Sequence, residues 1–229
     1  MNGEYDRNHE NNASEKKRSG RITSVRKQKG KPAVYEVYID DQPGVVVTEE
    51  MIVRHRILPG TIVHVDQCRQ WEEECKKSLA YHAAIAWLAA RPRTAKELER
   101  YLAHKGWDED TIRETIDRCH EQGYIDDLKL AIAVIEHRMG RQKMGRLRVI
   151  SELRQRGVNS EWIEEALRRF EENDEEEEWE RAMAVARKKW ASRYKNREEQ
   201  KRRTGMYLLR RGFESELVIK ILEKLENEM

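Results

Sequence analysis

The stretch LRQRGVNSEWIEEAL, residues 153–167, decides the fold of this chain. It spaces two leucines and two further apolar residues at fixed intervals around Gly157, and nearly the same spacing recurs around Gly106 and Gly212. These glycines lie 51 and 55 residues apart. A repeat of about fifty residues is typical of arrays in which each unit buries its apolar face against a neighbour.

Each copy predicts two helices joined at the glycine. A basic residue precedes every one of these glycines, and a cation stabilises a helix C-terminus. Glycine adopts the left-handed conformation that ends a helix without steric cost. Asp108 and Asn159 then stand where a new helix starts, and both residue types are good N-caps. The copies are therefore helix–glycine–helix units.

A third helix precedes each pair. The first is expected over 72–90 and ends before Pro92, after which Thr94 and Glu97 form a capping box. Similar apolar stripes start after 127 and after 178. The predicted fold is mainly α, with three tandem three-helix repeats that form an elongated, curved array. We place the repeats at residues 67–127, 128–173 and 174–229.

The N-terminal part has a different pattern. Residues 1–20 are polar without apolar periodicity, which predicts a disordered tail. Residues 21–66 predict a small β module, because short β-branched runs alternate with turn residues. Its strands are expected at 22–25, 33–39, 45–47 and 62–65, with a turn through Gly44 and a short helix over 48–56.

Composition narrows the class of protein. Charged residues make up 38% of the chain and aromatic residues 7%, which fits solvated helices with thin cores. No apolar run is long enough to span a membrane, and the N-terminus lacks the apolar segment of a secretion signal. Three cysteines without metal-binding spacing indicate reduced thiols. We therefore expect a cytoplasmic protein.

The net charge is only +2, but the basic residues are clustered. Residues 138–156 hold seven basic side chains and one acid, and residues 181–203 hold ten basic side chains and two acids. An acidic block with eight acids lies between them at 171–180. Charged runs on helices are often only solvated faces. Because both clusters occupy the same place in their repeats, the pattern favours a phosphate-binding face.

Several short motifs resemble the RecX family of regulatory proteins. They are RPRT at 91–94, KGW at 105–107, GYIDD at 123–127 and GRLRVISELRQRGV at 145–158. The resemblance covers residues 70–229, and the β module resembles longer members of the family. The third repeat departs most from the pattern, because a connection rich in Lys and Arg precedes Met206.

The resemblance implies a partner and a function. RecX proteins bind the filament of the RecA recombinase on single-stranded DNA, lie in its groove, and usually inhibit its ATP hydrolysis and strand exchange. It implies no cofactor, and we expect a monomer. We expect the basic side of the second and third repeats to contact the filament or its DNA. The candidate residues are Arg138, Arg141, Lys143, Arg146, Arg148, Arg154, Arg156, Lys188, Lys189, Arg193, Lys195, Arg197, Lys201, Arg202 and Arg203.

Other residues invite functional interpretations that have simpler alternatives. Asp126 and Asp127 could act as paired carboxylates, but an N-cap for the helix that follows is favoured. Gly140 and Gly145 either let a loop approach a phosphate or form a simple turn between helices. Trp179 and Trp190 could stack on bases, but their helical spacing favours the core.

No nucleophile–base pair, phosphate-binding loop or dinucleotide fingerprint occurs, so we expect a protein that is not an enzyme. The main alternative is a free-standing DNA-binding protein, because small three-helix units can place a helix in the major groove. The last helix of each repeat is acidic or mixed, which disfavours base reading. An RNA-binding array would need exposed aromatic platforms, which the sequence does not indicate.

Overall fold

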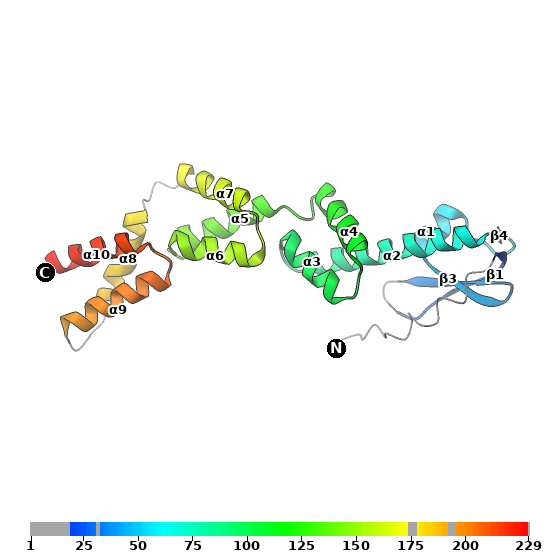
Figure 1. The fold of residues 1–229 in the computed structure, drawn as a ribbon, viewed down its shortest axis with the longest axis horizontal. Coiled ribbons are helices and arrows are strands. Elements are labelled where there is room, and N and C mark those ends of the chain that lie inside the picture. The colour runs from blue at the N-terminus through cyan, green and yellow to red at the C-terminus, as the bar shows by residue number, and fades with distance from the viewer. Residues whose placement is uncertain (1–18, 31–32, 174–177, 192–195, 229) are drawn as a thin grey trace. The chain divides into compact units, whose positions relative to one another are not determined.

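A computed structural model describes residues 19–30, 33–173, 178–191 and 196–228 (Figure 1). The predicted tail before residue 19 and positions 174–177 of the acidic block lie outside the described residues. The chain divides into two compact units. The first contains the described residues up to 89 together with 102–119, and the second contains residues 90–101 and the described residues from 120 onward.

The first unit contains an antiparallel sheet of four strands in the order β3-β2-β1-β4. The strands are β1 (Gly20–Lys27), β2 (Val34–Ile39), β3 (Gln42–Thr48) and β4 (Ile62–Val63). The expected turn through Gly44 is wrong, because Asp40 and Asp41 alone turn the chain. Both have positive φ, 46° and 62°, as a two-residue hairpin turn requires. Pro43 is accommodated because β3 is an edge strand.

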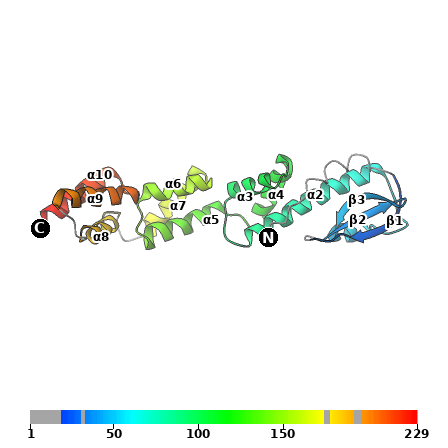
Figure 2. The same cartoon turned by 90° about the horizontal axis from the view of Figure 1, so that it is seen from below.

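Two helices complete this core. Helix α1 (Glu49–His55) begins at Thr48, whose hydroxyl accepts a hydrogen bond from the Met51 N–H. Helix α2 (Val65–Leu88) starts earlier than the predicted residue 72, and β4 is correspondingly shorter than predicted. The Gln67 side chain accepts from the His64 N–H at 2.9 Å, which stabilises this earlier start. Figure 2 shows α2 running beside the sheet, and both contribute side chains to one apolar core.

Helix α4 (Glu109–Glu121) joins the first unit through its residues 109–119. Asp108 caps it as predicted, accepting from the Thr111 N–H at 3.1 Å. The Lys76 ammonium lies 2.5 Å from the Asp108 carboxylate. The hydrogen bond from the Lys76 ammonium has the largest effect on the pKa of Asp108, and the one from the Thr111 N–H has the next largest. Together they hold this pKa well below its usual value. Arg118 lies over the Tyr81 ring at 3.8 Å, which adds a further link between α2 and α4.

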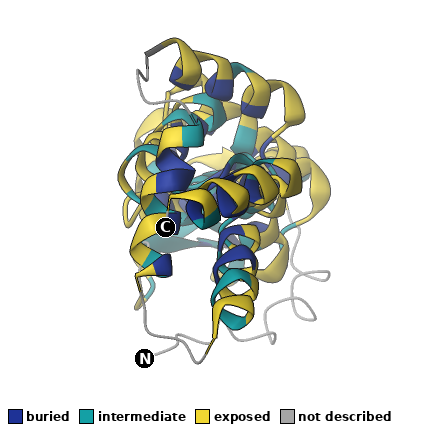
Figure 3. Cartoon of the chain, turned by 90° about the vertical axis from the view of Figure 1, so that its left-hand side faces the viewer, coloured by how far each residue is buried: buried dark blue, intermediate teal, exposed yellow. Residues whose placement is uncertain are grey.

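The second unit is helical throughout its regular structure and has two apolar cores. Residues 95–101 of α3 (Ala95–His104) belong to it. The first core joins α5 (Asp127–Ile135), η2 (Glu136–Arg141), α6 (Arg146–Arg156) and α7 (Ser160–Asn173), and the second joins α8 (Glu178–Trp190), α9 (Arg197–Arg210) and α10 (Ser215–Asn227). Figure 3 shows that much of the helix surface is exposed, as the high charge content predicts.

The three repeated glycines have the predicted left-handed conformation. Gly106, Gly157 and Gly212 have φ of 89°, 86° and 88°. After each glycine, the next residue donates its N–H to a leucine carbonyl in the helix just ended, at 3.0–3.3 Å. This pattern is the helix-ending geometry in which glycine is favoured. The prediction of helix–glycine–helix units is confirmed.

Within the second unit, the second helices of successive repeats meet end to end. The Thr94 hydroxyl at the start of α3 donates to the Arg156 carbonyl at the end of α6, at 2.7 Å. The Gly145 N–H at the start of α6 likewise donates to the Arg211 carbonyl beyond α9, at 2.9 Å. At the α6–α9 junction a backbone N–H and a carbonyl that the helix ends would leave unpaired thus satisfy one another, and at the α3–α6 junction a hydroxyl satisfies the carbonyl.

Gly145 serves packing between the repeats. A Cβ at this position would lie 2.3 Å from the Gly212 carbonyl carbon and from the Phe213 nitrogen. Only glycine permits this close backbone approach. Of the two interpretations given for Gly145, the structure therefore favours the junction between helices. The predicted mainly helical fold with three-helix repeats and a small N-terminal sheet is confirmed.

Candidate functional site

The structure describes thirteen of the fifteen candidate basic residues. Arg193 and Lys195 lie outside the described residues. The other candidates fall into three groups: side chains held in ion pairs, exposed side chains, and side chains that line a pocket. Their contacts separate structural cations from those available to a ligand.

Several candidates form ion pairs within the second unit. Arg156 contacts Glu97 at 3.1 Å, and Arg138 donates to both carboxylate oxygens of Glu152 at 3.0 Å. Further pairs join Arg146 to Glu171, Lys201 to Glu226 and Arg203 to Glu199. Because their charges are already compensated, these side chains are less suited to capture an external anion, and all of these pairs except Arg203–Glu199, which lies within α9, join different helices.

Six candidates are exposed and, within the described part of the chain, have no carboxylate at ion-pair distance. They are Arg141, Arg148, Arg154, Lys188, Arg197 and Arg202. The guanidinium of Arg148 donates to the Arg210 carbonyl at 3.0 Å, a contact that leaves its charge uncompensated. These cations give the second and third repeats a positive surface.

Arg148 and Arg154 lie on different sides of α6. The helix buries Val149 and Leu153, so the arginines flank this buried pair, one on each side. Six residues turn an α-helix by roughly 600°, or about 240° beyond one full turn, which separates the two arginines by about 120° around the axis. Their contributions to binding can therefore be tested separately.

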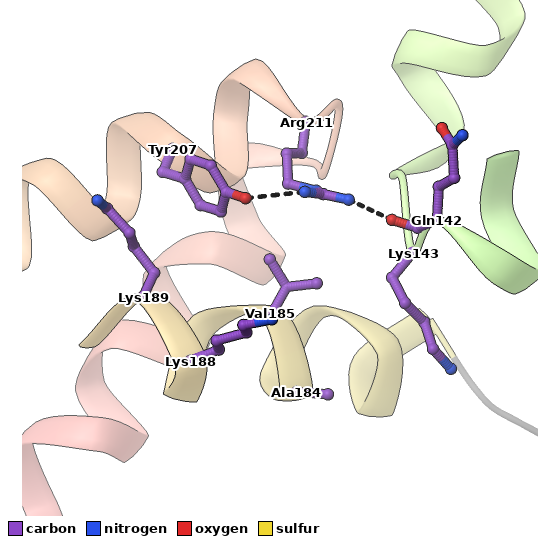
Figure 4. A pocket seen from close by; sticks show the side chains of 8 residues that line it. All are labelled: Gln142, Lys143, Ala184, Val185, Lys188, Lys189, Tyr207 and Arg211. Atoms are coloured by element: carbon purple, nitrogen blue, oxygen red, sulfur yellow. Dashed lines mark hydrogen bonds between the residues drawn. The ribbon is translucent and has the colours of Figure 1, made fainter. Parts of the chain in front are cut away.

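Two further candidates, together with Lys188, line a pocket of about 510 Å³ in the second unit (Figure 4). Lys143 comes from the loop between η2 and α6, and Lys188 and Lys189 come from α8. The remaining lining residues are Gln142, Ala184, Val185, Tyr207 and Arg211. Of the described residues that line the pocket, four carry a cationic side chain and none carries a carboxylate.

Arg211 is fixed in place at this pocket. Figure 4 shows its guanidinium between two partners: it donates to the Tyr207 hydroxyl at 2.8 Å and to the Gln142 carbonyl. Neither partner is charged, and the buried Nε atom has no hydrogen-bond partner among the described residues. Lys189 also lies near this group, with its ammonium 5.6 Å from the centre of the Tyr207 ring.

Tyr207 and Arg211 were missing from the predicted site. In the sequence Arg211 stands before a repeated glycine, which suggests only a helix C-terminus, and Tyr207 lies outside both basic clusters. The only feature of the sequence that pointed toward Tyr207 and Arg211 is the basic cluster at 181–203, which ends shortly before them. Lys143 was predicted, but its left-handed backbone, with φ of 52°, was not. Such a conformation in a lysine is unfavourable and is often found at binding sites.

The acidic candidates and Trp190 have structural roles. Asp126 caps α5 by accepting from the Lys129 N–H at 2.8 Å, and Asp127 accepts from the Ala95 N–H at 3.0 Å. Trp190 is buried in the core as predicted. Throughout the described ranges, no group of three His, Cys, Asp or Glu side chains is arranged to hold a metal ion.

The chain is similar to a known protein family over most of its helical part. Three family models match consecutive parts of it: the first three-helix domain of RecX at residues 80–119, the second at 126–167 and the third at 175–222. Together these matches cover more than half of the chain and include both basic clusters. The chain belongs to the RecX family.

Two relatives named "Regulatory protein RecX" illustrate the extent of the similarity. The one from Geobacillus sp. (strain WCH70) is 28% identical over 220 residues, which is 91% of this chain and 80% of the relative. The one from Clostridium acetobutylicum is 28% identical over 210 residues, or 90% of this chain and 97% of the relative. Membership of the RecX family therefore extends over most of the chain.

Solved RecX structures share the fold. One crystal structure of regulatory protein RecX covers 90% of this chain and 100% of its own, with a TM-score of 0.70 and 22% identity. RecX from Lactobacillus salivarius covers 66% of this chain and 97% of its own, with a TM-score of 0.55 and 23% identity. In the described ranges, no helix of this RecX-family chain has the length and apolar character needed to cross a membrane.

Proposed function

We propose that this chain regulates the RecA recombinase. In this proposal it binds the RecA filament on single-stranded DNA as a cytoplasmic monomer and inhibits ATP hydrolysis, strand exchange and filament growth. Its role is regulatory and not catalytic. Membership of the RecX family, whose similar members are named regulatory proteins, carries the proposal.

The distribution of charge supports a contact near DNA. Exposed cations such as Arg154 on α6 and Arg202 on α9 have no carboxylate at ion-pair distance within the described part of the second unit. Cations of this kind bind phosphate by releasing its counterions. We infer that the second and third repeats face the filament through these side chains. A regulator changes filament growth only if it binds one filament state more tightly than another.

The test is DNA-dependent ATP hydrolysis by RecA from the same organism, with the chain added well below one copy per RecA protomer. We expect hydrolysis to fall at this low ratio, because one bound regulator affects a growing filament. A rise in the rate of hydrolysis would indicate that the chain is a regulator that activates RecA. An unchanged rate up to equimolar chain would contradict the proposal. Binding to DNA without an effect on RecA would favour the alternative, a free-standing DNA-binding protein.

A further inference from the structure

The pocket lined by Lys143, Lys188, Lys189 and Arg211 has the composition of an anion site. Among the described residues that line it are one guanidinium and three ammonium groups and no acidic side chain. An anion placed among these cationic groups is attracted by each of them. The buried Nε of Arg211, which lacks a hydrogen-bond partner among the described residues, is a donor that a ligand or water would satisfy.

The geometry is also prepared for a ligand. The Arg211 guanidinium is fixed by the Tyr207 hydroxyl and the Gln142 carbonyl, and its own carbonyl accepts from the Gly145 N–H. The Lys143 loop is closed by the Met144 N–H, which donates to the Arg138 carbonyl at 2.9 Å. Side chains that are ordered before binding lose less entropy when a ligand arrives.

The remaining walls indicate what kind of anion fits. Ala184, Val185 and the Tyr207 ring give the pocket an apolar side. Its volume of about 510 Å³ lies in the range of sites for small organic ligands, well above the size of a single phosphate. Cations beside an aromatic ring are the combination that proteins use for single-stranded nucleic acid, with phosphate on the cations and a base on the ring.

We propose that this pocket binds one nucleotide of a single-stranded DNA strand, with its phosphodiester held by Lys143, Lys188 and Arg211. The base or sugar then lies against Tyr207 and Val185. The inference rests on the proposed function in one respect only, that the regulator works where single-stranded DNA is present. It adds that the chain contacts the strand directly.

The experiment uses the full chain without RecA. Binding of a fluorescent dT12 oligonucleotide is measured by anisotropy at several NaCl concentrations. The double variant Lys143→Ala/Lys188→Ala should bind about tenfold more weakly, and its salt dependence should fall by roughly 0.7 for each lost phosphate contact. The control Lys129→Ala/Lys220→Ala removes the same charge from exposed positions on α5 and α10, outside the pocket. It should retain the salt dependence of the unchanged chain.

A second measurement does not depend on how a variant folds. The Nε–H resonance of Arg211 in an NMR spectrum of the unchanged chain should shift when dT12 is added. An unmoved resonance, or equal losses in the pocket and control variants, would overturn the inference. Unlabelled dT12, ATP and pyrophosphate are then compared as competitors of the fluorescent dT12. If ATP or pyrophosphate displaces it at concentrations as low as unlabelled dT12 does, the DNA assignment is wrong and the ligand is a free nucleotide or phosphate.

The two proposals can fail separately. If dT12 binds at the pocket but RecA hydrolysis is unaffected, the proposed function is wrong and the pocket assignment stands. If the chain inhibits RecA while the pocket variant binds dT12 as tightly as the control variant, only the pocket assignment is wrong.

Discussion

Glu97 on α3 and Arg156 on α6 form an ion pair that joins two successive repeats. Two guanidinium nitrogens donate to the two carboxylate oxygens at 3.1 and 3.2 Å, and both side chains are about four-fifths buried. Glu97 also accepts from the Thr94 N–H at 3.0 Å, so the carboxylate caps its own helix while it holds the next repeat. The start of the second helix is thus stabilised by the same group that fixes the stacking.

This pair predicts a pH dependence of stability. Burial raises the pKa of Glu97, but hydrogen bonds from Arg156 and Thr94 outweigh it, so the folded pKa lies below the usual value. The contribution of ionised Glu97 to the stability of the fold is therefore fully present above a pH of roughly 4.5, the pKa in the unfolded chain. It is lost as the pH falls through the lower pKa of the folded chain. Glu97→Gln should lower the free energy of unfolding by about 1 to 3 kcal/mol at pH 7 and remove this acid-dependent part.

The measurement is urea unfolding at pH 7 and at a series of values below 5. Glu99→Gln is the matched control, because among the described residues the ion-pair partner of Glu99 is Lys96 on the same exposed face of α3. It should change stability by less than about 0.5 kcal/mol. Equal effects of the two substitutions at pH 7 would contradict the role assigned to the Glu97–Arg156 pair.

The glycines that end the second helices predict unequal costs of substitution. Gly106 and Gly212 have the same backbone conformation, with φ of 89° and 88°. A Cβ on Gly106 meets open space, whereas a Cβ on Gly212 would lie 2.4 Å from the Arg148 nitrogen and Cβ. Gly106→Ala should cost about 1 kcal/mol for the left-handed backbone, and Gly212→Ala should cost clearly more.

Hydrogen exchange locates this effect. The Leu147 N–H donates to the Gly212 carbonyl at 3.1 Å, so Gly212→Ala should speed exchange at this amide by opening the junction. Gly106→Ala should leave that amide protected. Faster exchange of the Leu147 amide in both variants would mean that the junction between α6 and the end of α9 does not depend on the absence of a Cβ at Gly212.

The cysteine thiols should be unreactive in the folded chain. Burial raises the pKa of Cys75 to about 11 and also raises the pKa values of Cys68 and Cys119. At pH 8 roughly one Cys75 thiol in a thousand is then a thiolate, the form that reacts. Labelling with a thiol reagent should be slow until urea unfolds the chain, when all three should react. Rapid labelling of native Cys75 would contradict its burial.

The same shift makes stability fall in alkali. The folded Cys75 thiol keeps its proton at a pH where the unfolded thiol, with a pKa of about 8.5, has lost it. Unfolding is therefore favoured increasingly as the pH rises from about 8.5 toward 11. Cys75→Ala should remove this component, and comparison of the two chains at pH 7.5 and 9.5 measures it.

The exposed cations predict separable effects on RecA. Arg154→Glu and Arg202→Glu should each weaken inhibition of ATP hydrolysis severalfold without changing the thermal unfolding midpoint, because neither side chain has a carboxylate at ion-pair distance among the described residues. Lys129→Glu on α5 is the control for added negative charge. Undiminished inhibition by both arginine variants would place the contact elsewhere on the chain.

Arg156→Glu should behave differently. Because it breaks the pair with Glu97 and puts two carboxylates together, we expect a lower unfolding midpoint along with any loss of inhibition. A binding defect with an unchanged midpoint would instead place Arg156 at the filament contact. This comparison separates the cations that hold the repeats from those that reach a ligand.

The sequence by itself determined most of the helices and the helix ends that a glycine or a capping residue sets. Glycine at 106, 157 and 212, and caps at Thr94, Asp108 and Asp126, act through backbone conformation and contacts within a few residues, so local spacing was enough to predict them. It also indicated the RecX family. Where local signals were weak, at the β2–β3 turn and the start of α2, the predicted boundaries were wrong.

Only the tertiary structure decided which cations are available. Charge clusters identify basic segments, but Arg156 meets Glu97, and Arg211 meets Gln142, across more than fifty residues of sequence. Such partners depend on how repeats stack, which no local pattern encodes. The same holds for the pocket, whose cations come from the loop before α6, from α8 and from the residue after α9, which become neighbours only when the second and third repeats pack together.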